Sequence, residues 1–180
     1  MWTLAQAAAQ AGGSLHGGDA RFTAVGTDSR ADCSGLLFIA LRGERFDGHD
    51  YVAATRLALG RLAGAWRDRF AGSIVAITGS NGKTTAKEMV AAILAQAGRT
   101  LATRGNLNND IGMPLTLLGA RDEDYLVLEM GANHPGEIGY MTEIARPHVA
   151  LITNAGRAHL EGFGSVEGVA RAKGVISRGL

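Results

Sequence analysis

The sequence has 180 residues, of which 46% are hydrophobic and 19% are charged, and its formal net charge is +1. This composition is typical of a packed soluble protein, and the small net charge argues against a broad nucleic-acid surface. The single cysteine, Cys33, excludes an internal disulfide framework. No stretch is long enough to span a membrane, and the alanine-rich start lacks the early positive charge of a signal peptide. We therefore expect a cytoplasmic, enzyme-like protein.

The first 71 residues give irregular signals for secondary structure. In chain order they predict a helix at the start, a strand in "RFTAVGTDSR", a strand in "LLFIALRG", the turn-rich "ERFDGHD" and a helix over 52–69. The pattern changes near Ala71 and Gly72. We therefore predict a small N-terminal α/β module over residues 1–71 and a second domain over 72–180.

From residue 72 the predicted strands and helices alternate regularly. The strands are the β-branched run that stops at Gly79, "RTLAT", "YLVLEM" and "HVALITN", and the helical patterns include "DIGMPLTLLGA", "GEIGYMTEIAR" and "SVEGVARAKGVISRGL". Alternation of this kind, with nearly all-apolar strands, predicts a parallel sheet covered on both faces. Ligands of such sheets bind at the carboxyl ends of the strands, so candidate residues are sought there.

The segment "VAITGSNGKTTAKEMV", residues 75–90, joins a strand to a helix. The β-branched run that stops at Gly79 favours a short buried strand. Gly98 stands where a C′ glycine would end the following helix. Apolar residues recur between the two glycines at helical spacing: Met89, Val90, Ile93, Leu94 and Ala97.

The loop between this strand and helix has the chemistry of a phosphate site. The start of a helix offers unpaired backbone N–H groups and the positive end of its dipole. Gly79 and Gly82 allow close approach, Lys83 can neutralise phosphate oxygens, and the Thr84 hydroxyl can complete the coordination of Mg²⁺. The spacing is G-x-x-G-K-T and not the longer G-x-x-x-x-G-K-[ST]. We interpret it as a phosphate-binding loop; the alternative is an ordinary Gly/Asn turn with a surface lysine.

Three further residues near strand ends or on the last helix are candidates for chemistry. Glu129 ends "YLVLEM", where its carboxylate could hold Mg²⁺ or could be merely solvated or capping a helix. His159 follows "HVALITN" and reaches the same region, although a lone histidine is more often packed or on the surface. Lys173 by itself resembles any solvated helix lysine.

Several segments together resemble the Mur ligase family. They are "TGSNGKTTAKEM", "TRGNLNNDIGMPLTLL", "EMGANHPGEI" and "HLEGFGSVEGVARAKGVI", while "TDSRADCSGLLFIALRGERFDGHDYV" resembles the family's N-terminal, UDP-sugar-binding domain. The resemblance implies a P-loop ATPase domain from residue 72 and an amide ligase that uses ATP and Mg²⁺ to activate a carboxylate as an acyl phosphate. The similarity is greatest to the member that joins UDP-MurNAc-tripeptide to D-alanyl-D-alanine in peptidoglycan precursor synthesis.

The resemblance also assigns roles to individual residues. It places the ATP phosphates on Gly79, Ser80, Asn81, Gly82, Lys83, Thr84 and Thr85. It implies catalytic roles for Lys83, His159 and Lys173, and metal binding by Thr84, Glu129, His159 and a carbamylated Lys173. The tripeptide is expected near Asn106, Asn108 and Asn109, and the nucleotide sugar near Ser29, Arg30, Arg42, Asp47, Gly48 and His49.

The sequence departs from the family pattern in two places. The family continues beyond the position of Leu180, so we expect the 180-residue chain to be inactive alone, and we expect it to be monomeric. The segment between "FDGHDYV" and "TRLALGRLAGAW" is shorter than in the family. Because Lys173 lies seven residues from the last residue, we expect its helix to fray and the lysine to stay largely unmodified in this chain.

Three alternative functions stay open. Another Mur ligase shares the "DSR" segment and the phosphate loop, although "GNLNNDIGMP" and "EMGANHPGEI" disfavour it. A folylpolyglutamate synthase shares the ATPase core but should lack the "TDSR" and "FDGHD" module. The chain could also be a nucleotide or UDP-sugar binding module without catalysis, which would bind ATP without releasing phosphate.

Overall fold

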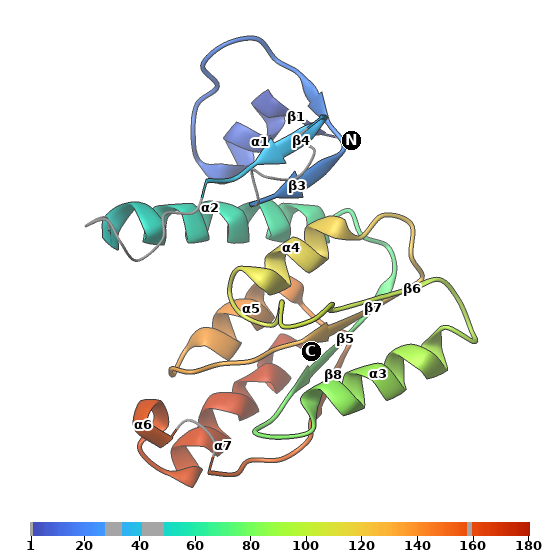
Figure 1. Ribbon diagram of the computed structural model, residues 1–180, viewed down its shortest axis with the longest axis vertical. Coiled ribbons are helices and arrows are strands. Elements are labelled where there is room, and N and C mark those ends of the chain that lie inside the picture. Colours follow the sequence, from blue (N-terminus) through green and yellow to red (C-terminus); the bar gives the residue numbers. More distant parts are fainter. Residues whose placement is uncertain (1, 28–33, 41–48, 158–159) are drawn as a thin grey trace.

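The computed structural model describes residues 2–27, 34–40, 49–157 and 160–180 (Figure 1). The N-terminal part contains two small two-stranded sheets. In one, β1 (Trp2–Thr3) pairs antiparallel with β2 (Arg21–Phe22); in the other, β3 (Ala24–Gly26) pairs in parallel with β4 (Leu36–Phe38). Between β1 and β2 lies α1 (Leu4–Ala11), which starts with a capping box of Thr3 and Gln6.

The rest of the chain is built on a four-stranded parallel sheet with the strand order β6-β7-β5-β8. The strands are β5 (Ser73–Thr78), β6 (Thr100–Ala102), β7 (Tyr125–Glu129) and β8 (Val149–Ile152). The helices between them are α3 (Lys83–Leu94), α4 (Gly112–Gly119) and α5 (Glu137–Ala145). After β8 come α6 (Leu160–Phe163), α7 (Val166–Gly174) and the 3₁₀ helix η1 (Val175–Gly179). The predicted α/β class with a parallel sheet is confirmed.

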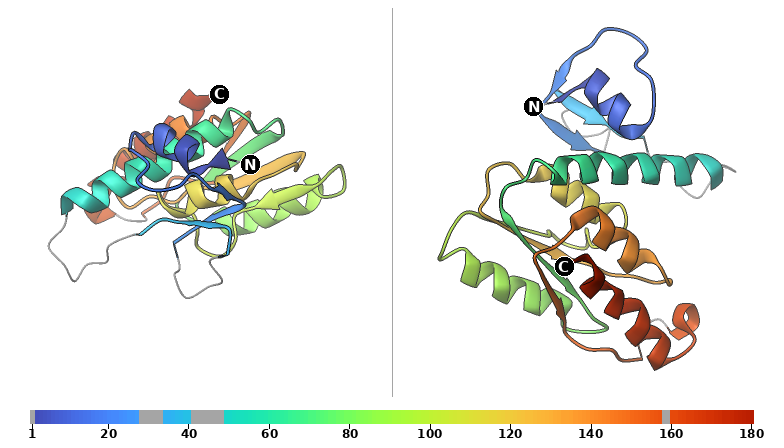
Figure 2. Two further views of the ribbon diagram at one scale, coloured as in Figure 1. Left: turned by 90° about the horizontal axis from the view of Figure 1, so that it is seen from above. Right: turned by 180° about the vertical axis from the view of Figure 1, so that it is seen from behind.

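The sheet separates two layers of helices. In Figures 1 and 2, α3 lies on one face and α4, α5 and α7 lie on the other. The long helix α2 (His49–Arg67) crosses over α4 and α5 and also packs against α1. Its contact with α5 is close, because a Cβ added at Gly60 would lie 2.0 Å from the hydroxyl oxygen of Tyr140. One hydrophobic core runs from Trp2 through α2 to Ile176.

The expectation that both faces of the sheet are covered is wrong for one part of the sheet. On β8, the side chains of Val149, Leu151 and Ile152 are exposed.

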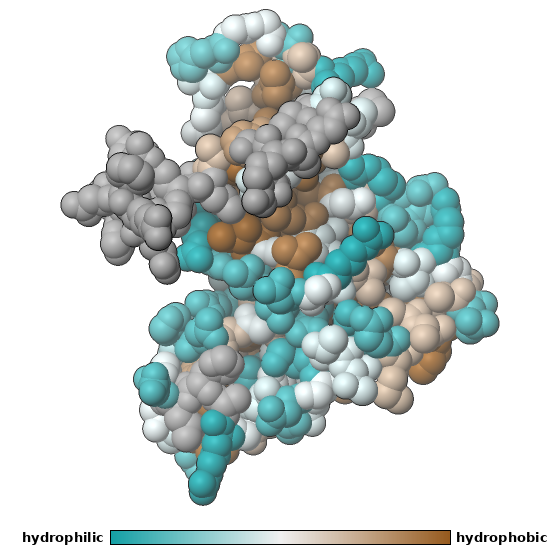
Figure 3. Space-filling view, in the orientation of Figure 1, coloured by the Kyte–Doolittle hydropathy of each residue, from teal (hydrophilic) through white to brown (hydrophobic). Residues whose placement is uncertain are grey.

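On α3, Met89 and Ile93 belong to the predicted apolar stripe, yet they are 62% and 66% exposed. Figure 3 shows brown, hydrophobic atoms over α3 on the surface. Helical spacing marks which residues share a face of α3, but it does not guarantee a neighbouring element that covers that face.

The predicted role of Gly98 as a C′ glycine is also wrong. The helix α3 ends at Leu94 with Ala95 as its cap, and Gly98 does not adopt a positive φ. Glycine fits there for a different reason: a Cβ would lie 2.7 Å from a carboxylate oxygen of Asp124, which accepts a hydrogen bond from the N–H of Arg99 at 2.8 Å. Close packing selects this glycine.

The end of the chain is packed, contrary to the expectation of a frayed helix. Val169 and Lys173 of α7 and Ile176 of η1 are buried, and η1 packs against α5. Lys173 is only 1% exposed. The apolar face that continues from α7 into η1 anchors the segment on α5, so nearness to the last residue does not loosen it.

Candidate functional site

The predicted phosphate loop lies between the carboxyl end of β5 and the start of α3. Gly79 and Gly82 have φ values of 151° and 75°, a region that residues with a side chain rarely adopt. A Cβ at Gly79 would also lie 1.9 Å from the hydroxyl oxygen of Thr153. The N-cap residue of α3 is Gly82, which has no side chain to cap the helix, so the first N–H groups of α3 can meet an anion.

The loop is fastened to the segment that follows β8. The N–H of Ser80 donates to the Asn154 carbonyl at 3.0 Å. The Asn154 side chain accepts from the N–H of Asn81 at 3.1 Å and donates to the Asn81 carbonyl at 3.1 Å. The hydroxyl of Thr153 donates to the same carbonyl at 2.6 Å, and the N–H of Gly156 donates to the Ser80 hydroxyl at 2.9 Å. The loop therefore keeps its shape through contacts between protein groups.

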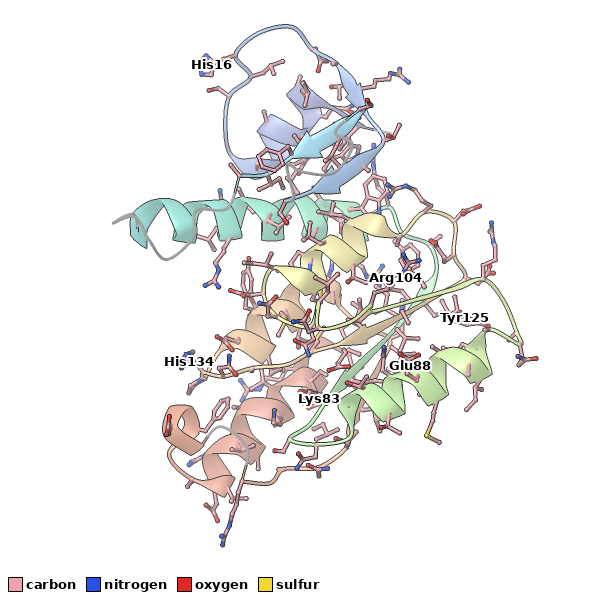
Figure 4. All side chains as sticks on the ribbon, in the orientation of Figure 1. His16, Lys83, Glu88, Arg104, Tyr125 and His134 are labelled. Carbon is pink, nitrogen blue, oxygen red and sulfur yellow. The ribbon has the colours of Figure 1, made fainter. Side chains whose placement is uncertain are left out.

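Lys83 begins α3 and folds back over this loop. Its Nζ donates to the carbonyl of Gly79 at 2.9 Å and lies 3.4 Å from that of Ser80. Thr84 and Thr85 follow on the exposed first turn of the helix. In Figure 4, Lys83 and His134 lie toward the same end of the sheet, and Tyr125 lies toward the other. The predicted phosphate ligands thus gather at the carboxyl ends of the strands.

Glu129 lies on the same rim, at the last position of β7. It pairs in register with Ile77 of β5 and is 2% exposed. Its Oε1 accepts a hydrogen bond from the Asn108 amide at 2.9 Å, and its backbone N–H donates to the Thr103 hydroxyl at 2.9 Å. Its Oε2 is buried and has no hydrogen-bond partner among the described residues.

A buried carboxylate oxygen without a partner is costly unless something else compensates its charge. A hard divalent cation such as Mg²⁺ prefers this kind of oxygen ligand. The residues present therefore fit a magnesium ion held by Glu129 beside the phosphate loop. Within the described ranges, however, no group of three His, Cys, Asp or Glu side chains could hold a metal ion, and His159 lies outside those ranges.

Lys173 lies near the same rim. Burial and the positive charge of Lys83 lower the pKa of the Lys173 ammonium from its ordinary value. The Nζ lies 6.0 Å from the centre of the Phe163 ring, within the range of a cation–π contact. In the described part of the chain it donates no hydrogen bond. Lys173 is thus a buried amine and not the solvated helix lysine that its sequence context suggests.

The three predicted asparagines have different surroundings. Asn108 holds Glu129, and Gly131 leaves room for it, because a Cβ there would lie 3.2 Å from the Asn108 side chain. The side-chain oxygen of Asn109 accepts from the N–H groups of Ile111 and Gly112 at the start of α4, at 3.3 and 2.8 Å. Asn106 is exposed. Substrate contacts by these residues stay a prediction.

The predicted nucleotide-sugar residues fall almost entirely outside the described residues. His49 is the first residue of α2, and its side chain is not described. The others lie outside the described ranges: Ser29, Arg30, Arg42, Asp47 and Gly48. The boundary at residues 71 and 72 also stays a prediction, and α2 packs on both sides of it.

A polar pocket of about 280 Å³ opens beside Lys83 and Asn108. Its lining includes residues that the sequence did not suggest: Arg56, Asp110, Gly131, Ala132, Asn133 and Glu137. Glu137 already accepts from the N–H groups of Asn133 and His134, at 2.7 and 3.2 Å. Arg56 comes from α2 and Asp110 from the loop before α4, so no local motif could have linked them.

Comparison with known families agrees with this geometry. Residues 77–180 match the Mur ligase middle domain, and residues 21–93 match the catalytic domain of the Mur ligase family. This chain belongs to the Mur ligase family. The predicted resemblance is thereby confirmed. The matched range 77–180 contains both the predicted phosphate loop and Glu129, which lie at the carboxyl ends of neighbouring parallel strands.

Named relatives within the Mur ligase family are closely similar. The UDP-N-acetylmuramoyl-tripeptide--D-alanyl-D-alanine ligase of Escherichia coli K12 is 48% identical over 205 aligned residues, which cover 99% of this chain and 45% of the relative. The alignment is longer than this chain, so the relative contains residues without a counterpart here. The shortened segment of the N-terminal module stays a prediction.

Two solved structures of Mur ligases are similar in fold. The UDP-N-acetylmuramoylalanyl-D-glutamyl-2,6-diaminopimelate--D-alanyl-D-alanyl ligase of Acinetobacter baumannii has 42% identity and a TM-score of 0.81, covering 98% of this chain and 46% of that one. MurF ligase from Thermotoga maritima in complex with ADP has 33% identity and a TM-score of 0.76, covering 87% and 43%. The chain thus spans a little less than half the length of these relatives. Among the described residues, no helix is both long and apolar enough to cross a membrane.

Proposed function

We propose that this protein acts in the ATP-dependent joining of D-alanyl-D-alanine to UDP-MurNAc-tripeptide, the reaction that the names of its relatives describe. The observation that carries the proposal is the unpartnered Oε2 of Glu129 beside the phosphate loop. A loop that fits phosphate and a buried carboxylate that fits Mg²⁺ together form a site for a metal nucleotide. The T. maritima relative, solved with ADP, supports the nucleotide part.

The residues of the rim divide the proposed chemistry among them. The N–H groups at the start of α3 and the Lys83 ammonium bind the ATP phosphates and stabilise negative charge as the terminal phosphoryl group moves to the substrate carboxylate. The amine of D-alanyl-D-alanine then attacks the acyl phosphate and phosphate leaves. Thr84, Glu129, His159 and Lys173 would hold Mg²⁺, which when bound screens the phosphate charges.

We include carbamylation of Lys173 in this proposal. Carbamylation begins when a neutral amine attacks CO₂, and a lowered pKa makes the neutral form more abundant at neutral pH. Carbamylation would replace the ammonium group of Lys173 with a carbamate, whose oxygen atoms are the hard ligands that Mg²⁺ prefers. The earlier reason for expecting an unmodified lysine in this chain, a frayed helix, does not hold, because α7 is packed around Lys173.

Other parts of the proposal stay predictions. The binding of the UDP-sugar by the N-terminal module, the monomeric state, the cytoplasmic location and the absence of nucleic-acid binding are expected for this function. The low activity expected of the 180-residue chain by itself is a prediction too. Of the alternatives, the relatives' names favour the D-alanyl-D-alanine ligase over other members of the family.

The test is the magnesium dependence of nucleotide binding by calorimetry. Wild type should bind ATP about 10-fold more tightly with Mg²⁺ than with EDTA, and Glu129→Gln should lose most of this difference, because one ligand to a charged centre is gone. The control is Gln96→Ala, which replaces an exposed residue that follows α3 and should behave as wild type. An undiminished Mg²⁺ effect in Glu129→Gln would refute the metal role.

A further inference from the structure

The 280 Å³ pocket contains charges of both signs. Lys83 lies at the phosphate loop, and the pocket wall adds Arg56 from α2 and Asp110 from the loop before α4. Asn108, Asn109 and Asn133 supply neutral amides. Glu137 also lines the pocket, but its Oε2 already accepts hydrogen bonds from the N–H groups of Asn133 and His134 in the loop before α5. Arg56 and Asp110 are therefore the pair of charges available to a ligand beyond the phosphate loop.

Arg56 and Asp110 are close to each other but poorly matched. The Nε of Arg56 lies 3.3 Å from the Oδ2 of Asp110, with side-chain exposures of 44% and 18%. The Nε nevertheless has no hydrogen-bond partner among the described residues, because its N–H does not point at that oxygen. Within the described ranges, the two side chains therefore neutralise each other's charge without a well-directed hydrogen bond between them, and both groups can still bind a ligand.

The position of Arg56 is set by the contact between α2 and α5. The hydroxyl of Tyr140 donates to the Arg56 carbonyl at 3.2 Å, and the absence of a side chain at Gly60 lets Tyr140 reach α2. Burial and the negative charge of Asp110 raise the pKa of the Tyr140 phenol, so this hydroxyl keeps its proton as a donor at neutral pH. Packing thus holds the backbone of Arg56 at the pocket wall.

The chemistry of the ligand follows from the reaction proposed above. In a peptide that ends in 2,6-diaminopimelate, the residue named for the A. baumannii relative, one amine forms the peptide bond and one carboxylate is activated. The outer end keeps a free carboxylate and a free ammonium group on one carbon. A planar guanidinium beside a carboxylate is complementary to such a pair of charges. Lysine at the same place would offer the ammonium group alone.

We propose that the Arg56–Asp110 wall of this pocket recognises the outer, zwitterionic end of the third residue of the tripeptide, with Arg56 on the carboxylate and Asp110 on the ammonium group. This inference rests on the proposed function and specifies its substrate as the diaminopimelate peptide. Lys83, which lines the same pocket, then lies beside the carboxylate that is activated.

The experiment measures binding of two UDP-MurNAc-tripeptides, one ending in diaminopimelate and one in lysine, by calorimetry with the chain saturated with Mg²⁺ and ADP. Wild type should prefer the diaminopimelate peptide by about 10-fold or more, as expected for one charged hydrogen-bonding contact. Arg56→Gln should abolish the preference by weakening only that peptide. Asp110→Asn should weaken both peptides, because both carry the outer ammonium group.

Arg61→Gln is the matched control, since Arg61 lies on the same helix outside the pocket and hydrogen bonds the Ala11 carbonyl. It should keep the wild-type preference. Equal affinity of wild type for the two peptides would overturn the inference. Equal losses of affinity for both peptides in Arg56→Gln would also overturn it, and would assign Arg56 to the glutamyl carboxylate that both peptides share. Failure to bind either peptide while ADP binds normally would also overturn it, whereas failure to bind ADP would count against the proposed function itself.

Discussion

Two parts of the rim differ in how far their polar groups are hydrogen bonded within the protein. In the phosphate loop, Ser80 and Asn81 are fastened by hydrogen bonds to Asn154 and its neighbours. Across the rim, Glu129 and Arg56 each keep one buried polar atom without a hydrogen-bond partner in the described part of the chain. The hydrogen bonds of the loop fix its conformation. The charged groups of Glu129 and Arg56 each retain an atom that the described residues do not hydrogen bond.

The difference separates two tasks of a binding site. A loop that presents backbone N–H groups to phosphate must hold its conformation before the ligand arrives, because ordering it on binding would cost affinity. Charged side chains that select a cation or a substrate gain most when their partners come from the ligand. Substitutions on the two sides should therefore affect binding and stability in different proportions.

The largest effect is expected for Lys83→Ala. It should weaken Mg²⁺–ATP binding by about 100-fold, because a charged contact to phosphate is lost, while the free energy of unfolding changes by less than about 1 kcal/mol. Lys83 bonds only to carbonyls of its own loop among the described residues, so the fold does not depend on it. Calorimetry and urea unfolding measure the two quantities. Arg171→Ala removes a surface cation of α7 as a control, and a matching loss there would point to net charge instead.

The next effect concerns Lys173, whose buried ammonium has no anionic partner in the described part of the chain. Lys173→Met should stabilise the chain by about 1–3 kcal/mol at pH 7 in bicarbonate-free buffer, because it removes a buried cation that faces the Phe163 ring. The folded chain binds this proton more weakly than the unfolded chain, so wild-type stability rises as the pH climbs from the lowered pKa toward the ordinary value of 10.5. The gain from Lys173→Met should therefore shrink between pH 7 and pH 10, as followed by urea unfolding at each pH.

The same pair of proteins tests the carbamate. With Mg²⁺ and ¹³C-bicarbonate, wild type should show a carbamate carbon signal by NMR that Lys173→Met lacks. A stability gain that is independent of pH would contradict the buried charge. A spectrum without the carbamate would contradict the proposed modification and leave the burial of the amine intact.

The smallest effect is expected for Asn154→Ala, because Asn154 hydrogen bonds with the phosphate loop. It removes two hydrogen bonds to Asn81 and should cost about 1 kcal/mol of stability and about 5-fold in nucleotide affinity. Thermal unfolding and calorimetry give the two numbers. Loss of affinity without any loss of stability would mean that Asn154 acts on the nucleotide directly, and the contrast between the two sides of the rim would then fail.

Local patterns were enough to predict the elements and part of the site. The run into Gly79 and the lysine after Gly82 lie within one strand, loop and helix, and Glu129 follows from its place at the end of a strand. Contacts distant in the sequence were not predictable in this way. The Arg56–Asp110 pair and the Asn81–Asn154 pair join residues 54 and 73 positions apart.

Burial was the other quantity that local patterns misjudged. Lysines are mostly exposed in proteins, so nothing in the sequence around Lys87 or Lys173 indicated that both are buried. Lys87 is accommodated because its ammonium donates to the Thr103 carbonyl at 2.9 Å and pairs with Glu88. The apolar stripe of α3 gave the opposite error at Met89 and Ile93, since exposure depends on which elements pack nearby.

The helix α2 gives the molecule a mechanical property. Its inner residues Leu59, Leu62 and Ala63 belong to the same core as the sheet, and Arg56 is only one turn of helix away from them. A fluctuation that lifted α2 would expose the core and dismantle the Arg56 wall in one step. The amide protons of α2 and those of the central strands should then exchange with solvent through a shared, high-energy opening, and the Arg56 wall of the 280 Å³ pocket should open only when the core opens.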